Sequence, residues 1–85
     1  MKFGTRSANG TVNTSFPLLT DSQYRSLVGR SFDNTRDIVL AMNADESVGK
    51  FVVIGTFATS GTIYASVDKA YTGWYRINFM IMAGR

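Results

Sequence analysis

Apolar and polar residues alternate over most of the second half of the chain, which is the pattern of strands with one buried face. Four segments either alternate in this way or are rich in β-branched and aromatic residues: 37–42, 51–59, 62–67 and 74–83. They follow one another through short loops, which predicts an antiparallel meander. Residues 51–59 are apolar on both faces, so this segment is predicted to be a central strand, with Gly55 marking a bulge or a close backbone approach.

A short helix is predicted at residues 21–28. Thr20 and Gln23 have the spacing of a capping box, and Gly29 is a natural helix stop. The apolar residues between them recur at helical spacing. Because so short a helix is not stable alone, we expect it to dock on a sheet.

The first 16 residues leave two alternatives open. Residues 12–16 alternate and predict a strand that Pro17 ends. Asn9 and Gly10 form a dipeptide typical of tight turns, so residues 3–8 could pair back across it as one arm of a hairpin. The alternative is that residues 1–16 form an extended or flexible arm.

These elements predict one mainly β domain over residues 1–85, a small antiparallel β-sandwich or a partly open barrel with the one short helix. A chain of 85 residues buries only a modest core and usually needs a staple. The sequence has no Cys and no His, so disulfides are excluded and zinc, copper and haem lose their best ligands. We therefore expect no cofactor and no metal, and we expect assembly with copies of the chain or docking on a larger body.

The last strand has two different faces. One face is plain core, made of Tyr75, Ile77, Phe79 and Ile81. The other is polar in its middle and apolar toward its end, and consists of Trp74, Arg76, Asn78, Met80 and Met82. So short a chain has little material with which to cover Met80 and Met82. Either this face meets another subunit, or the sheet folds over and buries both faces.

The residue types argue against catalysis. Without His, Ser-His-Asp and Cys-His schemes are excluded. Asp33 and Asp37 are close in sequence, but no motif supports a pair of catalytic carboxylates, and Asp45 and Glu46 fall in an expected loop. The net charge of +3 results from nine basic and six acidic residues, and the basic ones are spread along the chain without the cluster that a phosphate-backbone binder usually carries. We expect a non-enzymatic protein.

Aromatic and basic residues near the C-terminus form the candidate binding set. These residues are Lys69, Tyr71, Trp74 and Arg76, with Tyr64 possibly opposite them on a neighbouring strand and with Met80 and Met82 as interface candidates. Such a set can anchor a protein interface, stack on sugar rings, or stack on nucleic-acid bases. The plainer interpretation is that Trp74 and Tyr75 are core residues at the entry of the strand.

Residues 61–66 (Gly-Thr-Ile-Tyr-Ala-Ser) and 73–82 (Gly-Trp-Tyr-Arg-Ile-Asn-Phe-Met-Ile-Met) resemble segments of small bacteriophage virion proteins, namely C-terminal β domains of tail fibres and capsid decoration proteins. The resemblance covers residues 36–85 and carries over no functional residue. It implies an oligomeric virion component whose partners are its own copies or other virion proteins. The length favours an accessory capsid or tail protein over a fibre.

The remaining expectations concern location and rival functions. No apolar run is long enough for a membrane helix, and no hydrophobic stretch follows the first six residues as in a secretory signal. We therefore expect no membrane partner, and a protein made in the host cytoplasm and incorporated into the virion. The first alternative is a receptor- or carbohydrate-binding tip. A small nucleic-acid-binding barrel is less favoured.

Overall fold

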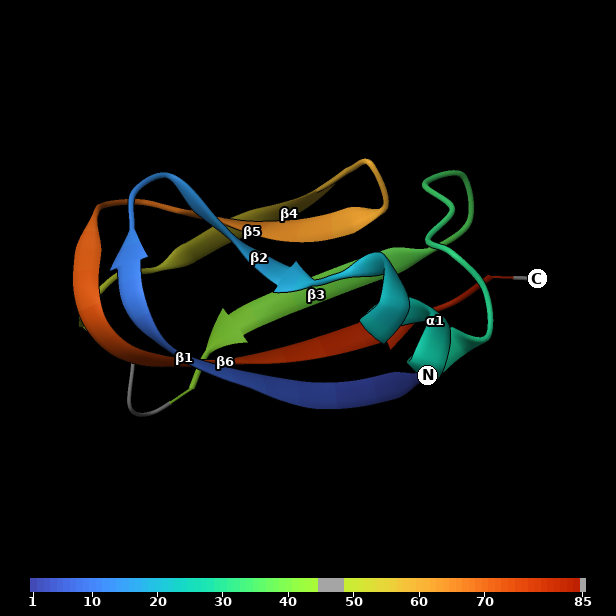
Figure 1. The fold of residues 1–85 in the computed structure, drawn as a ribbon, viewed down its shortest axis with the longest axis horizontal. Coiled ribbons are helices and arrows are strands. Elements are labelled where there is room, and N and C mark those ends of the chain that lie inside the picture. The colour runs from blue at the N-terminus through green and yellow to red at the C-terminus, as the bar shows by residue number, and fades with distance from the viewer. Residues whose placement is uncertain (45–48, 85) are drawn as a thin grey trace.

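The computed structural model describes residues 1–44 and 49–84, and these residues form a mainly β fold (Figure 1). The elements are β1 (Lys2–Val12), β2 (Ser15–Leu19), α1 (Asp21–Val28), β3 (Ile38–Asn43), β4 (Val53–Thr59), β5 (Thr62–Val67) and β6 (Tyr71–Met82). Strands account for 59% of the structure and helix for 10%. The prediction of a mainly β fold with one short helix is confirmed. Residues 45 and 46, which we expected in a loop, lie outside the described residues.

Two three-stranded antiparallel sheets enclose the core. The strand order is β1-β6-β3 in one sheet and β2-β5-β4 in the other, and the pair is not closed into a barrel. Figure 1 shows β6 curving from the end of the second sheet into the centre of the first. Each sheet contributes its inward-facing positions to one apolar cluster, which includes Phe16, Leu18, Ile63, Ala65, Tyr75, Ile77, Phe79 and Ile81.

The predicted core face of the last strand is confirmed. Tyr75, Ile77, Phe79 and Ile81 are all buried. Tyr75 packs against Phe16 with ring centroids 5.0 Å apart, so an aromatic contact joins the two sheets at this end of the core. β6 lies between β1 and β3, and a strand with this apolar content is protected from edge-to-edge pairing by its central position.

The predicted meander is wrong, because only β4 and β5 pair as consecutive strands of that series. β3 pairs with β6, from Ile38 opposite Met82 to Asn43 opposite Ile77, while β5 pairs with β2 and β4. β3 and β4 therefore lie in different sheets, and so do β5 and β6. This arrangement lets the inward faces of both sheets cover each other, which a single four-stranded sheet could not do.

The prediction that residues 51–59 form a central strand is also wrong. β4 is an edge strand, and Ile54 and Phe57 on it are exposed. Its register against β5 shifts between Val53 and Gly55, which confirms the irregularity expected at that glycine. The apolar residues on both faces of residues 51–59 therefore belong to an exposed edge strand, and not to a strand that is buried on two sides.

The hairpin across Asn9 and Gly10 is not formed. β1 runs straight through both residues and pairs with β6 over its whole length, from Lys2 opposite Ile81 to Val12 opposite Tyr71. The pairing with β6 satisfies the backbone groups of β1 that face β6, so these residues need no turn to find hydrogen-bond partners.

Pro17 does not end the strand that contains it. β2 continues to Leu19, with a register shift between the two residues. The strand lies at the edge of its sheet, where a residue without a backbone N–H is tolerated.

The helix begins and ends where the sequence predicts. Thr20 Oγ1 accepts a hydrogen bond from the backbone N–H of Gln23 at 3.2 Å, and the Thr20 N–H donates to Gln23 Oε1 at 2.9 Å. Gly29 ends the helix with φ of 96°, a left-handed conformation that favours glycine. Tyr24 is fully buried and belongs to the core cluster, so the helix docks on the sheets as expected. Among the residues described, no helix has the length and apolar character needed to cross a membrane.

Candidate functional site

The outward side of the sheet β1-β6-β3 carries a continuous apolar surface, which we call the outer apolar face. It consists of Phe3 on β1, Met80 and Met82 on β6, and Ile38, Leu40 and Met42 on β3. Four of these side chains are largely open to solvent: Phe3 is 70% exposed, Met42 65%, Ile38 52% and Leu40 47%. Exposed apolar side chains grouped in this way are uncommon on small monomeric proteins and typically mark an interaction surface.

Strand register brings the six residues together. Phe3 lies opposite Met80, and Met80 lies opposite Leu40, so one apolar row crosses all three strands. Ile38 lies opposite Met82 in the next row toward the end of the chain, and Met42 lies opposite Asn78 in the row on the other side. Because paired residues of an antiparallel sheet point to the same side, all three rows face away from the core.

A shallow groove of about 220 Å³ runs across this face. Phe3 borders it on the β1 side, Leu40 and Met42 border it on the β3 side, and Met80 lies between them. Asn78 and Phe79 complete the lining. The groove is thus an apolar recess with protruding apolar side chains at its borders.

Charge is nearly absent from the outward positions of these three strands. Thr5 and Asn78 form the row beside Phe3 and Met80, and Thr5 Oγ1 donates a hydrogen bond to Asn78 Oδ1 at 2.9 Å. The single charged residue among the outward-facing strand positions is Arg76, which lies one row further on, opposite Ser7. The apolar rows therefore lie at one end of the sheet and the cation toward the other.

Trp74 lies on the same outward side at the far end of β6 and is 64% exposed. It lies opposite Asn9 and next to the outward pair Thr11 and Thr72, whose hydroxyl oxygens are 3.2 Å apart. Its backbone carbonyl accepts a hydrogen bond from the Tyr71 hydroxyl at 3.0 Å. The indole ring therefore stands on an ordered strand among short polar side chains.

The predicted binding residues do not form one cluster. Trp74, Arg76, Met80 and Met82 share the outward side of β6. Tyr71 is instead half-buried at the edge of the core, where its ring packs against Phe51 at 5.7 Å and beneath the Lys50 ammonium at 5.5 Å.

The other two predicted residues lie apart from that face. Tyr64 is on the second sheet, opposite Phe57 and not opposite the last strand, and their rings stack at 5.2 Å. Lys69 is exposed in the connection between β5 and β6. The interpretation of Tyr75 as a core residue is confirmed, whereas Trp74 is not part of the core.

Sequence reasoning missed Phe3, Ile38, Leu40 and Met42 as parts of this surface. The alternation over residues 37–42 was visible, but both of its faces are apolar, and Val39 proves to be the buried side. Phe3 joins the surface only through the pairing of β1 with β6, which no local signal announces.

A second region with polar chemistry surrounds Asp37. The carboxylate of Asp37 is buried and accepts hydrogen bonds from the Arg30 guanidinium and from the Tyr24 hydroxyl, the latter at 2.8 Å. The Arg30 hydrogen bonds are the largest cause that holds the pKa of Asp37 well below its ordinary value, against the opposing effect of burial. Burial and the hydrogen bond to Asp37 raise the pKa of Tyr24.

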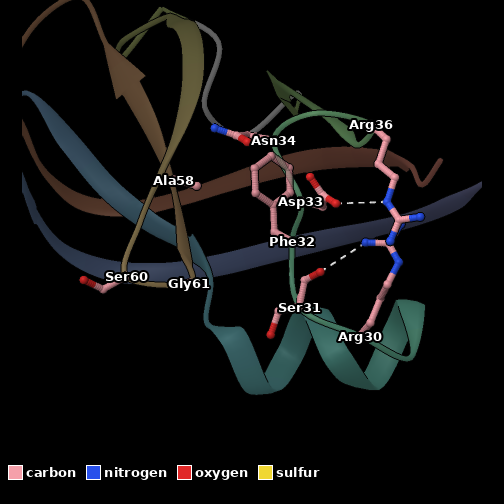
Figure 2. Close-up of a pocket in the computed structure, with 9 residues that line it drawn as sticks. All are labelled: Arg30, Ser31, Phe32, Asp33, Asn34, Arg36, Ala58, Ser60 and Gly61. Atoms are coloured by element: carbon pink, nitrogen blue, oxygen red, sulfur yellow. Dashed lines mark hydrogen bonds and ion pairs between the residues drawn. The ribbon is translucent and has the colours of Figure 1, made fainter. Parts of the chain in front are cut away.

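Asp33 lies on the side of this region that opens to solvent. It lines a wide groove of about 460 Å³ and pairs with Arg36 at 3.0 Å. Figure 2 shows the two side chains joined by a dashed line. Hydrogen bonds from the Thr35 side chain and backbone, more than Arg36, lower the pKa of Asp33. Hydrogen-bond donors nearby thus keep both aspartates as carboxylates. These contacts stabilise the loop between α1 and β3. Within residues 1–44 and 49–84, no three acidic side chains are grouped so as to hold a metal ion.

No family model, curated protein or solved structure matches this chain. Its function must be argued from its own surface.

Proposed function

We propose that this chain is a non-enzymatic structural module of a virion, which docks through its outer apolar face on copies of itself or on a larger capsid or tail surface. The observation that carries the proposal is the exposure of Phe3, Leu40 and Met42 around one groove. Burying a large apolar side chain that was exposed contributes about 1.5–3 kcal/mol. The isolated chain leaves these side chains in water and does not gain that free energy. A partner that covers them would gain it on binding.

The positions of the charged residues favour docking through the outer apolar face. They disfavour the alternative, in which a partner adds a strand at the edge formed by β1. Arg6 on β1 faces inward, opposite the buried Ile77. Inward-pointing charges on an edge strand oppose the addition of another strand, because pairing would bury them further. The outer apolar face carries no such obstacle across the rows of Phe3 and Ile38.

The assignment to a virion comes from the resemblance of residues 61–66 and 73–82 to small bacteriophage virion proteins. It is consistent with a fold in which a small core is enclosed by two short sheets while one sheet offers an apolar exterior. In an assembly of many copies, weak contacts of this kind add to a strong attachment through avidity.

The test is whether the chain sediments with virus particles. We expect the protein to copurify with them through a density gradient at a constant number of copies per particle. Leu40→Lys should dissociate it, because the substitution places a charge in the apolar row that crosses all three strands. Phe57→Lys is the matched control, because Phe57 is 44% exposed on the outward side of the other sheet.

Thermal unfolding of both variants shows whether they are folded. Recovery of the wild-type protein only in the soluble fraction, away from particles, would contradict the proposal. So would equal retention of the two variants on the particles.

A second candidate function is recognition of a sugar, and the exposure of Trp74 favours it. The indole is surrounded by Asn9, Thr11 and Thr72, which supply hydrogen-bonding groups beside an aromatic plane. Trp74→Ala is expected to abolish binding on a glycan array while leaving the melting temperature unchanged. Retained binding, or an unfolded variant, would contradict a role for the ring as a sugar platform.

A further inference from the structure

We infer that a groove between β1, β2 and α1 binds a small organic acid, whose carboxylate pairs with Arg6 and whose short aliphatic tail contacts the core. The groove has a volume of about 430 Å³. None of the residues of the outer apolar face lines it. The inference therefore adds a second site to the molecule and does not depend on the proposed function.

The groove lies at an open side of the sandwich. β1 and β2 are edge strands of different sheets, and within residues 1–44 and 49–84 no strand pairing joins one to the other. Both strands line the groove, and α1, which follows β2, forms a third wall. The volume lies within the range of about 300–1,000 Å³ that is usual for small-ligand sites. A ligand that enters here from solvent reaches the core between the sheets.

Arg6 is the one charged side chain among the described residues that line the groove. Its Nε atom is buried and has no hydrogen-bond partner, and no acidic side chain of the described part of the chain pairs with its guanidinium. By contrast, Arg25, Arg30 and Arg36 each pair with an aspartate. Removing part of a guanidinium from water without a partner costs free energy. An anion that reaches Arg6 supplies the contact that the chain itself does not.

The polar groups around Arg6 suit a single carboxylate. One cation balances one negative charge, and a planar guanidinium can donate two parallel hydrogen bonds to a carboxylate. β1 has a free edge, and alternate residues of an antiparallel strand direct their backbone groups to that edge. A backbone N–H of Arg6 or of its neighbours Thr5 and Ser7 therefore lies beside the groove as a further donor. Ser26 adds a hydroxyl on the wall that α1 forms.

The remaining lining suits an apolar tail. Leu19 and Phe79 are buried residues of the core, and Leu27 on α1 packs partly buried against that core. All three line the groove. Burying methylene groups against such residues is favourable, so an acid with a tail should bind more tightly than its head group alone.

The test is an NMR titration of the purified protein with hexanoate, 1-hexanol and acetate, which separate the charged head from the tail. We expect hexanoate to bind with a dissociation constant of about 1 mM, in keeping with its small size. It should shift the backbone amide resonances of Thr5, Arg6 and Ser26 and leave those of Phe57 and Tyr64 in place. 1-Hexanol lacks the charge and acetate lacks the tail, so each should bind at least tenfold more weakly.

Two arginine variants test where the head group binds. Arg6→Met removes the charge but keeps a long unbranched side chain, and it should weaken hexanoate binding at least tenfold. Arg25→Met is the matched control, because Arg25 pairs with Asp21 and does not line the groove. Hexanoate should raise the melting temperature of the wild-type protein and of Arg25→Met, and not that of Arg6→Met. Without hexanoate, Arg6→Met should melt no lower than the wild-type protein, because it removes a cation that has no partner.

Several results would overturn the inference. Equal affinity for 1-hexanol and hexanoate would remove the role of the charge, and wild-type affinity in Arg6→Met would remove the role of Arg6. Hexanoate that shifts no resonance around the groove would remove the site itself. A large drop in the melting temperature of Arg6→Met without hexanoate would assign Arg6 to the stability of the fold instead. Copurification with virus particles tests a different surface, so either idea can fail while the other stands.

Discussion

Arg30 donates two parallel hydrogen bonds to the buried carboxylate of Asp37, from Nη1 to Oδ2 and from Nη2 to Oδ1, each 2.7 Å long. Such bidentate pairs are among the strongest and most directional polar contacts in proteins. Arg30 Nη2 also donates to the carbonyl of Gly84 at 2.9 Å, and the Gly84 N–H donates to Asp37 Oδ1 at 2.9 Å. The pair thus ties the segment after α1, the start of β3 and the segment after β6 into one unit.

Replacing Asp37 should destabilise the fold strongly. Asp37→Asn keeps the size of the side chain but removes the charge that Arg30 and Tyr24 are arranged around. Breaking a buried pair by removing one partner costs about 3–5 kcal/mol of unfolding free energy. Urea denaturation measures this loss. Asp33→Asn, which removes a solvent-exposed pair with Arg36, should have a much smaller effect. Equal losses in the two variants would contradict a special role for Asp37.

Asp37 should also make stability depend on acid pH. Its pKa in the folded chain lies below the ordinary value of 3.8, chiefly because of Arg30. Below that ordinary value the unfolded chain binds a proton that the folded chain does not, so unfolding becomes more favourable as pH falls. The stabilisation is complete above about pH 5 and is lost progressively below about pH 4. Thermal melts between neutral and strongly acid pH should show this fall, and it should be smaller in Asp37→Asn.

Two glycines on β1 should respond differently to alanine. A Cβ added at Gly4 would lie 2.3 Å from the tip of the Phe79 ring, whereas one added at Gly10 would meet no atom within 4 Å. Gly4→Ala should therefore force the core residue to move and cost roughly 1–3 kcal/mol. Gly10→Ala should change stability by less than about 1 kcal/mol, in either direction. Chemical denaturation of the pair is the measurement, and a reversed order would mean that Phe79 packs elsewhere.

The side of the sandwich between β3 and β4 is held together by a side-chain amide. Asn43 Nδ2 donates to the carbonyl of Phe51 at 2.7 Å, and the Val53 N–H donates to Asn43 Oδ1 at 3.0 Å. Asn43→Ala leaves these backbone groups without that partner, so we expect a loss of about 1–3 kcal/mol. Hydrogen exchange should quicken at Val53 and stay unchanged at Ala65 in the centre of the second sheet. Unchanged protection at Val53 would contradict the bridging role.

The fold was predictable from the sequence where the signals are local. Thr20, Gln23 and Gly29 interact with residues only a few positions away, so the bounds of α1 could be read from them. The buried side of β6 could be read as well, because its alternation persists over eight residues and one side carries Arg76 and Asn78. Alternation of this kind depends only on the pleat of the strand itself.

The candidate site was only half predictable. Trp74, Arg76, Met80 and Met82 were recognised together because they alternate along one strand. Tyr71 was grouped with them because it is close in sequence, and Tyr64 because it was expected on a neighbouring strand. Tyr71 instead packs against Phe51, and Tyr64 lies on the other sheet. Phe3 is 77 positions from Met80, so nothing in its neighbourhood indicates the contact that makes it part of the surface.

By itself, the sequence determined that this is a small, mainly β domain with one capped helix and a last strand with a buried side and an open side. Those features arise from backbone geometry and from neighbours along the chain. Only the tertiary structure decided which strands pair, and so it placed Phe3 and Leu40 on either side of Met80. Strand partners are chosen by the joint burial of two sheets, a property of the whole chain that no single segment contains.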